Sequence, residues 1–315
     1  TMTRFSKIVS TTIAMLIIAC SVMKYGEESA RFEKKLPSDV PTRTATSRHG
    51  ERVTLVRAAI NGEELGWFML VSGSSYIVID AKQVPRIRKL SKQSETEIPY
   101  PCKLPVTVYH AGALTVGPLT IKNLDVVAFD LSGVSQEFDE EIVGMLGFPV
   151  FAHAVVKIEY GSDGNDDRVS IFSPNSFALT DGQWQPLGAL YFQPVMTARV
   201  NRTHTAPFVI DTGYSGGVSF YSVFAANHDI LEGRPTSEKP SFTLCGETTE
   251  LEGTVRVFEI GSNTHDQLAV TIFQPGSITD VAPGRLGGMA GRGFLVNYDV
   301  VFDVQNQRIA FVEEG

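Results

Sequence analysis

An internal repeat constrains the fold of this chain more than any other feature. Five positions correspond to five positions 140 residues later: Asn61 to Asn201, Phe68 to Phe208, Val71 to Asp211, Gly73 to Gly213 and Ser75 to Ser215. Two further stretches, starting at Gly144 and Gly288, match at an offset of 144 residues, and the drift between the two offsets fits one loop insertion. The sequence therefore predicts two similar copies, 51–175 and 186–315, joined by a segment rich in turn residues.

Both copies carry the signals of β-strands. Short runs rich in Val, Ile, Leu and Phe alternate with turn residues at the spacing typical of all-β folds. The runs are 52–60, 68–70, 106–108, 119–129 and 155–160 in the first copy, and 194–200, 208–210, 254–260, 268–273 and 299–311 in the second. Helical periodicity is weak, and only 222–227 and 294–297 suggest short helices. We therefore expect an all-β fold.

The composition is that of a globular protein with many turns. The chain has 315 residues, of which 43% are hydrophobic and 20% charged, so each copy can bury its own core. The formal net charge is -8 and the sequence pI is about 5.3. Because phosphate backbones attract clustered Lys and Arg, nucleic acid is not expected as a partner.

The first residues read as an export signal. Arg4 and Lys7 precede an apolar run from Ile8 to Ala19, which suits the central region of a signal peptide at 1–20. The run ends in Ile-Ile-Ala-Cys, which resembles the lipobox of bacterial lipoproteins. That resemblance implies lipidation of Cys20 and anchoring at the periplasmic face of a membrane, possibly the outer membrane. An ordinary cleaved signal and an uncleaved anchor remain alternatives. Residues 21–50 are polar and predict a flexible tether.

The sequence from Phe208 to Ser215 places an acid at the end of an apolar strand. Asp211 is followed by Thr212 and Gly213, where glycine permits a sharp turn and the hydroxyl can hydrogen-bond to backbone. Two such turns brought together can hold two carboxylates that share one proton, because both cannot ionise at that distance. The ionised group then takes a proton from water while the protonated group polarises a carbonyl, which is amide hydrolysis without a cofactor.

These residues resemble the pepsin and retropepsin group of aspartic peptidases. The resemblance covers about residues 50 to 313 and includes three elements of the second copy, Phe208–Ser215, Met289-Ala290-Gly291 followed by Arg292, and the strand Asn297–Asp303. It implies two β-lobes related by a pseudo-twofold axis, an endopeptidase activity, and an extended peptide as substrate in the cleft between the lobes. It also implies a flap hairpin from the first lobe, within 96–114, and neither metal nor cofactor.

The first copy departs from this pattern at one position. Val71 stands where the family has its first aspartate, followed by Ser72 and Gly73, and Met145-Leu146-Gly147 occupies the later element. Serine in place of threonine fits the family, but valine has neither a proton nor a charge to offer. Acid and base groups each contribute about 10²–10⁴-fold to rate, so hydrolysis by a pair within one chain is expected to be nearly abolished.

Four explanations for Val71 stay open. Second copies from two chains could pair and restore two aspartates, or Asp80 could lean into the gap. Val71 could be an inactivating change from aspartate. The chain could also be a natural pseudoprotease, a catalytically inactive peptide-binding or scaffolding lipoprotein that uses the cleft between lobes.

Other candidate sites are weaker. Asp163, Asn165 and Asp167 alternate as in calcium loops, but no EF-hand glutamate follows and a solvated hairpin is favoured. The histidines lack metal-ligand spacing. Cys102 and Cys245 fall at similar places in the two copies, which favours two separate thiols over a disulfide.

Overall fold

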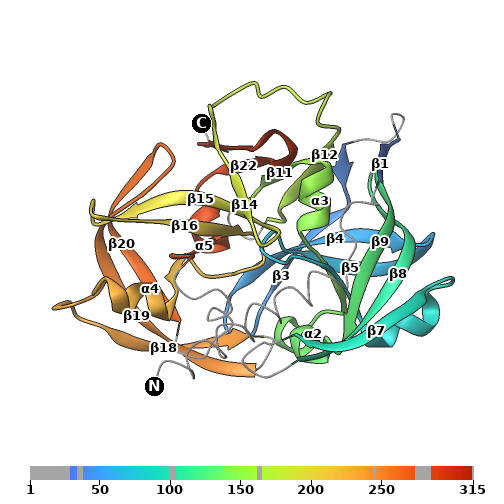
Figure 1. Ribbon diagram of the computed structural model, residues 1–315, viewed down its shortest axis with the longest axis horizontal. Helices are drawn as coiled ribbons and strands as arrows, with labels where there is room; N and C mark the ends of the chain where they lie inside the picture. The colour runs from blue at the N-terminus through green and yellow to red at the C-terminus, as the bar shows by residue number, and fades with distance from the viewer. Residues whose placement is uncertain are drawn as a thin grey trace, which may run out of the picture.

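The computed structural model describes residues 29–33, 38–98, 104–161, 165–243, 246–273 and 285–313. Strands dominate this part of the chain and form three sheets (Figure 1). The all-β prediction is therefore confirmed.

One large sheet is built mainly from the first copy. Its strand order is β1-β9-β6-β10-β5-β4-β8-β7, and β3 pairs with β4. The strands are β1 (Ser29–Phe32), β3 (Thr42–Thr46), β4 (Arg52–Ile60), β5 (Glu63–Leu70), β6 (Ile77–Asp80), β7 (Ser91–Ile98), β8 (Leu104–Val116), β9 (Leu119–Phe129) and β10 (Ile142–Leu146).

A second large sheet is built from the second copy. Its order is β14-β15-β16-β21-β17-β20-β19-β18. The strands are β14 (Gly188–Leu190), β15 (Gln193–Val200), β16 (His204–Asp211), β17 (Val218–Phe220), β18 (Ser237–Thr243), β19 (Gly246–Ile260), β20 (Asn263–Phe273) and β21 (Gly288–Gly291). In Figure 1 this sheet lies at the left, in yellow to orange, and the first sheet at the right, in blue to green.

The third sheet contains strands from both copies. Its order is β13-β23-β22-β11-β12-β2, and antiparallel pairing of β11 with β22 joins the copies directly. The strands are β2 (Asp39–Val40), β11 (Val155–Glu159), β12 (Arg168–Phe172), β13 (Trp184–Pro186), β22 (Asp299–Asp303) and β23 (Arg308–Val312). Figure 1 shows β11, β12 and β22 between the two larger sheets.

The same strand pairing occurs once in each large sheet. β10 lies parallel to β5 and antiparallel to β6, and β21 lies parallel to β16 and antiparallel to β17. Glycine is required where these strands meet. A Cβ added at Gly144 would lie 2.3 Å from the Val78 carbonyl oxygen, and one at Gly288 would lie 2.0 Å from that of Ser219. The repeat in sequence is thus a repeat in strand arrangement.

Each copy also contains a long antiparallel hairpin. β7 pairs with β8 in the first copy, and β18 pairs with β19 in the second. The first hairpin covers the range in which the resemblance implies a flap, although residues 99–103 between its strands lie outside the described residues.

The helices are short and were only partly predicted. They are η1 (Ala81–Arg86), α2 (Ser132–Phe138), α3 (Phe148–His153), α4 (Ser222–Asn227), α5 (Arg292–Leu295) and η3 (Val304–Asn306). The sequence indicated α4 and the region of α5. It gave no signal for α2 and α3, because one to two helical turns are too short to establish a period.

Part of the segment predicted as a tether, 21–50, is folded into strands. Residues 29–32, 39–40 and 42–46 are strands, and Val40 and Ala45 are buried. The strand β3 forms because its sequence, TRTAT, is rich in β-branched residues and finds a pairing partner in β4. A polar segment without apolar periodicity can therefore still complete a sheet edge. Cys20 and the predicted signal peptide lie outside the described residues.

Candidate functional site

The two predicted turns lie against each other. The Thr212 hydroxyl donates a hydrogen bond to the carbonyl oxygen of Leu70 at 2.7 Å, and the Ser72 hydroxyl donates to that of Ile210 at 2.7 Å. Each hydroxyl also accepts a 3.0 Å hydrogen bond from the backbone amide of the other residue. Ser72 and Thr212 are fully buried. This reciprocal set of four hydrogen bonds holds positions 71 and 211 together.

The carboxyl group of Asp211 lies against Gly73 in the turn of the first copy. Its Oδ1 accepts hydrogen bonds from the amides of Gly213, at 2.9 Å, and Gly73, at 3.2 Å. A Cβ added at Gly73 would lie 2.3 Å from the Asp211 Cγ. Any other residue at 73 would thus displace the acid, which explains the glycine.

The side chain of Val71 lies over Gly213 as that of Asp211 lies over Gly73, but valine has no carboxyl group. A Cβ added at Gly213 would lie 2.5 Å from Cγ1 of Val71, so valine covers the turn of the second copy. Val71 also packs against an apolar cluster of the first copy that includes Met69, Val78 and Met145. Among the described residues, Asp211 has hydrogen-bond donors from backbone but no side-chain partner.

Asp80 does not supply the missing carboxylate. It is buried at the end of β6, where it accepts hydrogen bonds from the amides of Lys82, at 3.3 Å, and Leu131, at 3.4 Å. Asp80 therefore caps η1 and anchors the segment before α2. Pairing of second copies from two chains is also disfavoured, because it would have to break the four hydrogen bonds between Ser72 and Thr212 and their partners.

The later repeated element supports both turns in the same way. The amide of Arg292 donates to the carbonyl oxygen of Tyr214 at 2.7 Å, and the amide of Phe148 donates to that of Ser74 at 2.7 Å. The spacing of the repeat therefore corresponds to matching backbone contacts on the two sides of the site.

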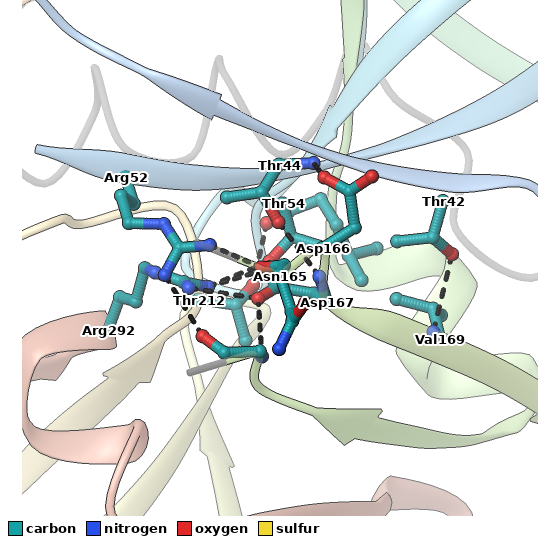
Figure 2. Close-up of polar contacts among 12 residues, drawn as sticks. Thr42, Thr44, Arg52, Thr54, Asn165, Asp166, Asp167, Val169, Thr212 and Arg292 are labelled. Atoms are coloured by element: carbon teal, nitrogen blue, oxygen red, sulfur yellow. Dashed lines mark hydrogen bonds and ion pairs between the residues drawn. The ribbon is translucent and has the colours of Figure 1, made fainter. Parts of the chain in front are cut away.

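Arg292, whose amide supports the turn of the second copy, also forms a buried ion pair. Arg292 donates to both carboxylate oxygens of Asp167, at 2.6 and 2.9 Å, and the Thr54 hydroxyl donates to the same carboxylate at 2.6 Å. The Arg292 side chain is 3% exposed and that of Asp167 is fully buried. The guanidinium also lies 4.7 Å from the ring centroid of Tyr160. Figure 2 shows Arg292 of the second copy directed toward Asp167 in this loop of the first copy.

The predicted hairpin is present, because β11 and β12 pair antiparallel, and Asn165 and Asp166 are exposed, but Asp167 is buried and not solvated. Arg52 donates to the carbonyl oxygens of Gly161 and Asn165, and Thr44 accepts a 2.8 Å hydrogen bond from the Asp167 amide (Figure 2). Arg52 thus holds the backbone of the loop, and Asp167 in the loop neutralises the buried guanidinium of Arg292. Asp163 lies outside the described residues. The sequence indicated Arg292 through its position after Gly291, but no local pattern identified its partner.

The remaining candidates have limited structural support. Within the described ranges, no group of three or more His, Cys, Asp or Glu side chains is arranged to hold a metal ion. Cys102 and Cys245 fall outside those ranges, so the expectation of two separate thiols stays a prediction. No helix in the described part of the chain is long and apolar enough to cross a membrane.

Comparison with known proteins does not extend these findings. No protein-family model matches the sequence, and a search of curated proteins finds no match.

Burial raises the pKa of the Asp211 carboxyl, although hydrogen bonds from the amides of Gly213, Gly73 and Tyr214 oppose the shift. The folded protein therefore retains a proton at pH values where the unfolded chain has released it. The stability contributed by this proton is complete below the ordinary aspartate pKa and is lost as pH rises through the folded value.

We expect Asp211→Asn to be more stable than the unaltered chain at neutral pH, because asparagine carries no charge to bury. The difference should shrink toward acid pH, where aspartate is protonated in both states. Urea unfolding at several pH values measures it. A constant difference across pH would show that titration of Asp211 does not contribute.

Replacing Thr212 by valine should destabilise the protein by about 1–3 kcal/mol, since it leaves the Ser72 amide and the Leu70 carbonyl buried without this partner. Thr212→Ser keeps the hydroxyl and is the matched control. Denaturant unfolding of both variants tests the prediction, and equal losses would contradict it.

Proposed function

We propose that this chain is a homologue of the pepsin and retropepsin-like aspartic endopeptidases in which loss of one acid leaves peptide binding with little hydrolysis. The observation that carries the proposal is the reciprocal hydrogen bonding of Ser72 and Thr212, which sets Asp211 opposite position 71. Two repeated strand arrangements and a sheet shared by both copies fit the bilobal fold of that family.

The chemistry follows from the one carboxylate present. Asp211, when ionised, can accept a proton from a water molecule that attacks a peptide carbonyl. The reaction also needs a donor that protonates the developing oxyanion or the leaving nitrogen. Val71 cannot supply that proton, so the expected turnover is small.

The structural observations support peptide binding more than they support hydrolysis. Val71 fills its position by packing against the apolar cluster of the first copy and against Gly213, so the change from acid to valine leaves the paired turns intact. The antiparallel hairpin β7–β8 is our candidate for the flap that covers peptides in the family. We further propose that the protein acts outside the cytoplasm as a lipoprotein anchored through Cys20, without metal or cofactor.

The test is a comparison of binding with hydrolysis. Fluorescein-labelled fragments of a denatured protein should bind the unaltered chain, as measured by anisotropy, and unlabelled extended peptides should compete. The same fragments should remain uncut during long incubation at mildly acid pH. Failure to bind any extended peptide would contradict the proposal, and rapid cleavage would contradict the role given to Val71.

A further inference from the structure

A cluster of polar side chains lies beside the Asp211 turn in the second copy. The Tyr214 hydroxyl lies 2.5 Å from Oγ of Ser219 and 3.1 Å from Oε2 of Glu250. The Ser241 hydroxyl donates to Oε1 of Glu250 at 2.8 Å. Thr271 completes the cluster through contacts with the Ser219 and Tyr214 hydroxyls. The Glu250 carboxylate is thus bonded by two hydroxyl groups, those of Tyr214 and Ser241, and Tyr214 links it to the hydroxyls of Ser219 and Thr271.

The first copy has valines at the equivalent strand positions. Ser219 pairs with Thr271 across β17 and β20, as Val78 pairs with Val127 across β6 and β9. Thr271 pairs with Glu252 of β19, and Glu250 lies two residues before that partner. In the same way, Val127 pairs with Val108 of β8, and Val106 lies two residues before it. Val78, Val106 and Val127 belong to the apolar cluster of the first copy. The fold therefore accepts an apolar core here, and polar residues are not needed to form it.

The polar cluster belongs to the same side of its sheet as the candidate site. In the first copy, Val71 packs against the apolar cluster that contains the three equivalent valines. In the second copy, the Tyr214 amide donates a hydrogen bond to the Asp211 carboxyl, while the Tyr214 hydroxyl contacts Glu250. One residue thus connects the acid to the cluster.

Within the part of the chain that the structure describes, the carboxylate of Glu250 has no cationic partner. Glu250 is 3% exposed, yet none of the described Lys, Arg or His side chains forms an ion pair with it. Lys239 is opposite Glu250 in the strand register, but its side chain is exposed and makes no ion pair with it. Burying a carboxylate carries a large desolvation cost unless a cation compensates it. A ligand can supply that cation.

The hydroxyl groups near Glu250 can hydrogen-bond to a cationic group of a ligand. Tyr214 and Ser241, which contact Glu250, and Thr271, which contacts Tyr214, are partly exposed, and hydroxyl oxygens accept hydrogen bonds from ammonium or guanidinium groups. Burial and the nearby Glu250 raise the pKa of Tyr214, so its phenol remains a hydrogen-bond donor to the carboxylate.

We propose that the cluster of Tyr214, Ser219, Ser241, Glu250 and Thr271 receives a lysine or arginine side chain of the peptide bound beside Asp211. This inference rests on the proposed function and names the class of peptide that the site selects. The apolar cluster at the equivalent place in the first copy gives no such selection, so the preference for a basic residue applies to one side of the bound peptide.

Position-scanned peptides test this inference. Each acetylated, fluorescein-labelled decapeptide carries one lysine, or norleucine as its uncharged analogue, in an otherwise constant Ala and Val sequence. At one position, the unaltered chain should bind the lysine peptide on the order of tenfold more tightly, as expected for a charge-assisted hydrogen bond. Glu250→Gln, which keeps the size of the side chain, should abolish that ratio, and Glu250→Val should favour norleucine.

Glu238→Gln is the matched control, because it removes the same charge from an exposed neighbouring position on β18. It should leave the ratio unchanged, and thermal unfolding verifies that each variant is folded. Peptides that bind without a lysine preference, or a preference that survives in Glu250→Gln, would overturn the basic subsite alone. No binding by any peptide would overturn the proposed function as well.

Discussion

Restoring aspartate at position 71 is expected to create peptidase activity that the unaltered chain lacks. The side chains of Val and Asp are similar in size, and Val71 already lies over Gly213 as Asp211 lies over Gly73. Two carboxyls would then share one proton, so one activates water while the other polarises the carbonyl. Hydrolysis of a denatured protein at mildly acid pH should rise by about 10²–10⁴-fold.

Two controls separate this gain from other causes. Val71→Asn places a polar side chain of the same shape at the site but cannot donate an acidic proton, and it should remain inactive. Adding Asp211→Asn to Val71→Asp should abolish the gain. Inactivity of Val71→Asp together with retained peptide binding would support a pure binding protein. Pepstatin-sensitive activity of the unaltered chain would mean that a second acid reaches Asp211 from elsewhere.

Breaking the Arg292–Asp167 pair is expected to give the largest loss of stability. Arg292→Met leaves the fully buried carboxylate of Asp167 without its cation, and losses of about 3–5 kcal/mol are typical for such changes. Because the pair joins a residue of the first copy to one of the second, its loss should lower the free energy of unfolding of both copies together. Urea denaturation monitored by tryptophan fluorescence measures the change.

The double variant Arg292→Met with Asp167→Leu makes the prediction more specific. It removes both charges, so it should recover part of the stability lost in Arg292→Met, and the two single losses should not add. Arg199→Met breaks an exposed pair with Glu259 and should have little effect. A loss in the double variant equal to the sum of the two single losses would show that the charges do not interact.

The sequence alone was sufficient to predict the all-β class, the repeated strands and the candidate pair of turns. Strand runs such as 52–60 and 119–129 coincide with β4 and β9, because alternating apolar residues and turn signals are local properties of the chain. The run 299–311 is interrupted at η3, where three residues form a turn between β22 and β23. The common offset of 140 residues, which relates Val71 to Asp211, indicated that these two positions would meet, since similar copies tend to pair by symmetry.

Tertiary structure alone decided what surrounds that acid. Asp167 appeared to belong to a solvated loop, yet it neutralises Arg292, which lies 125 residues away in the chain. Likewise, no local pattern identified Glu250, which is buried and in contact with the Tyr214 hydroxyl. Local sequence patterns record which residues favour a strand or a turn. They carry no information about which distant charge or hydroxyl will share a buried position, because that depends on how the sheets pack.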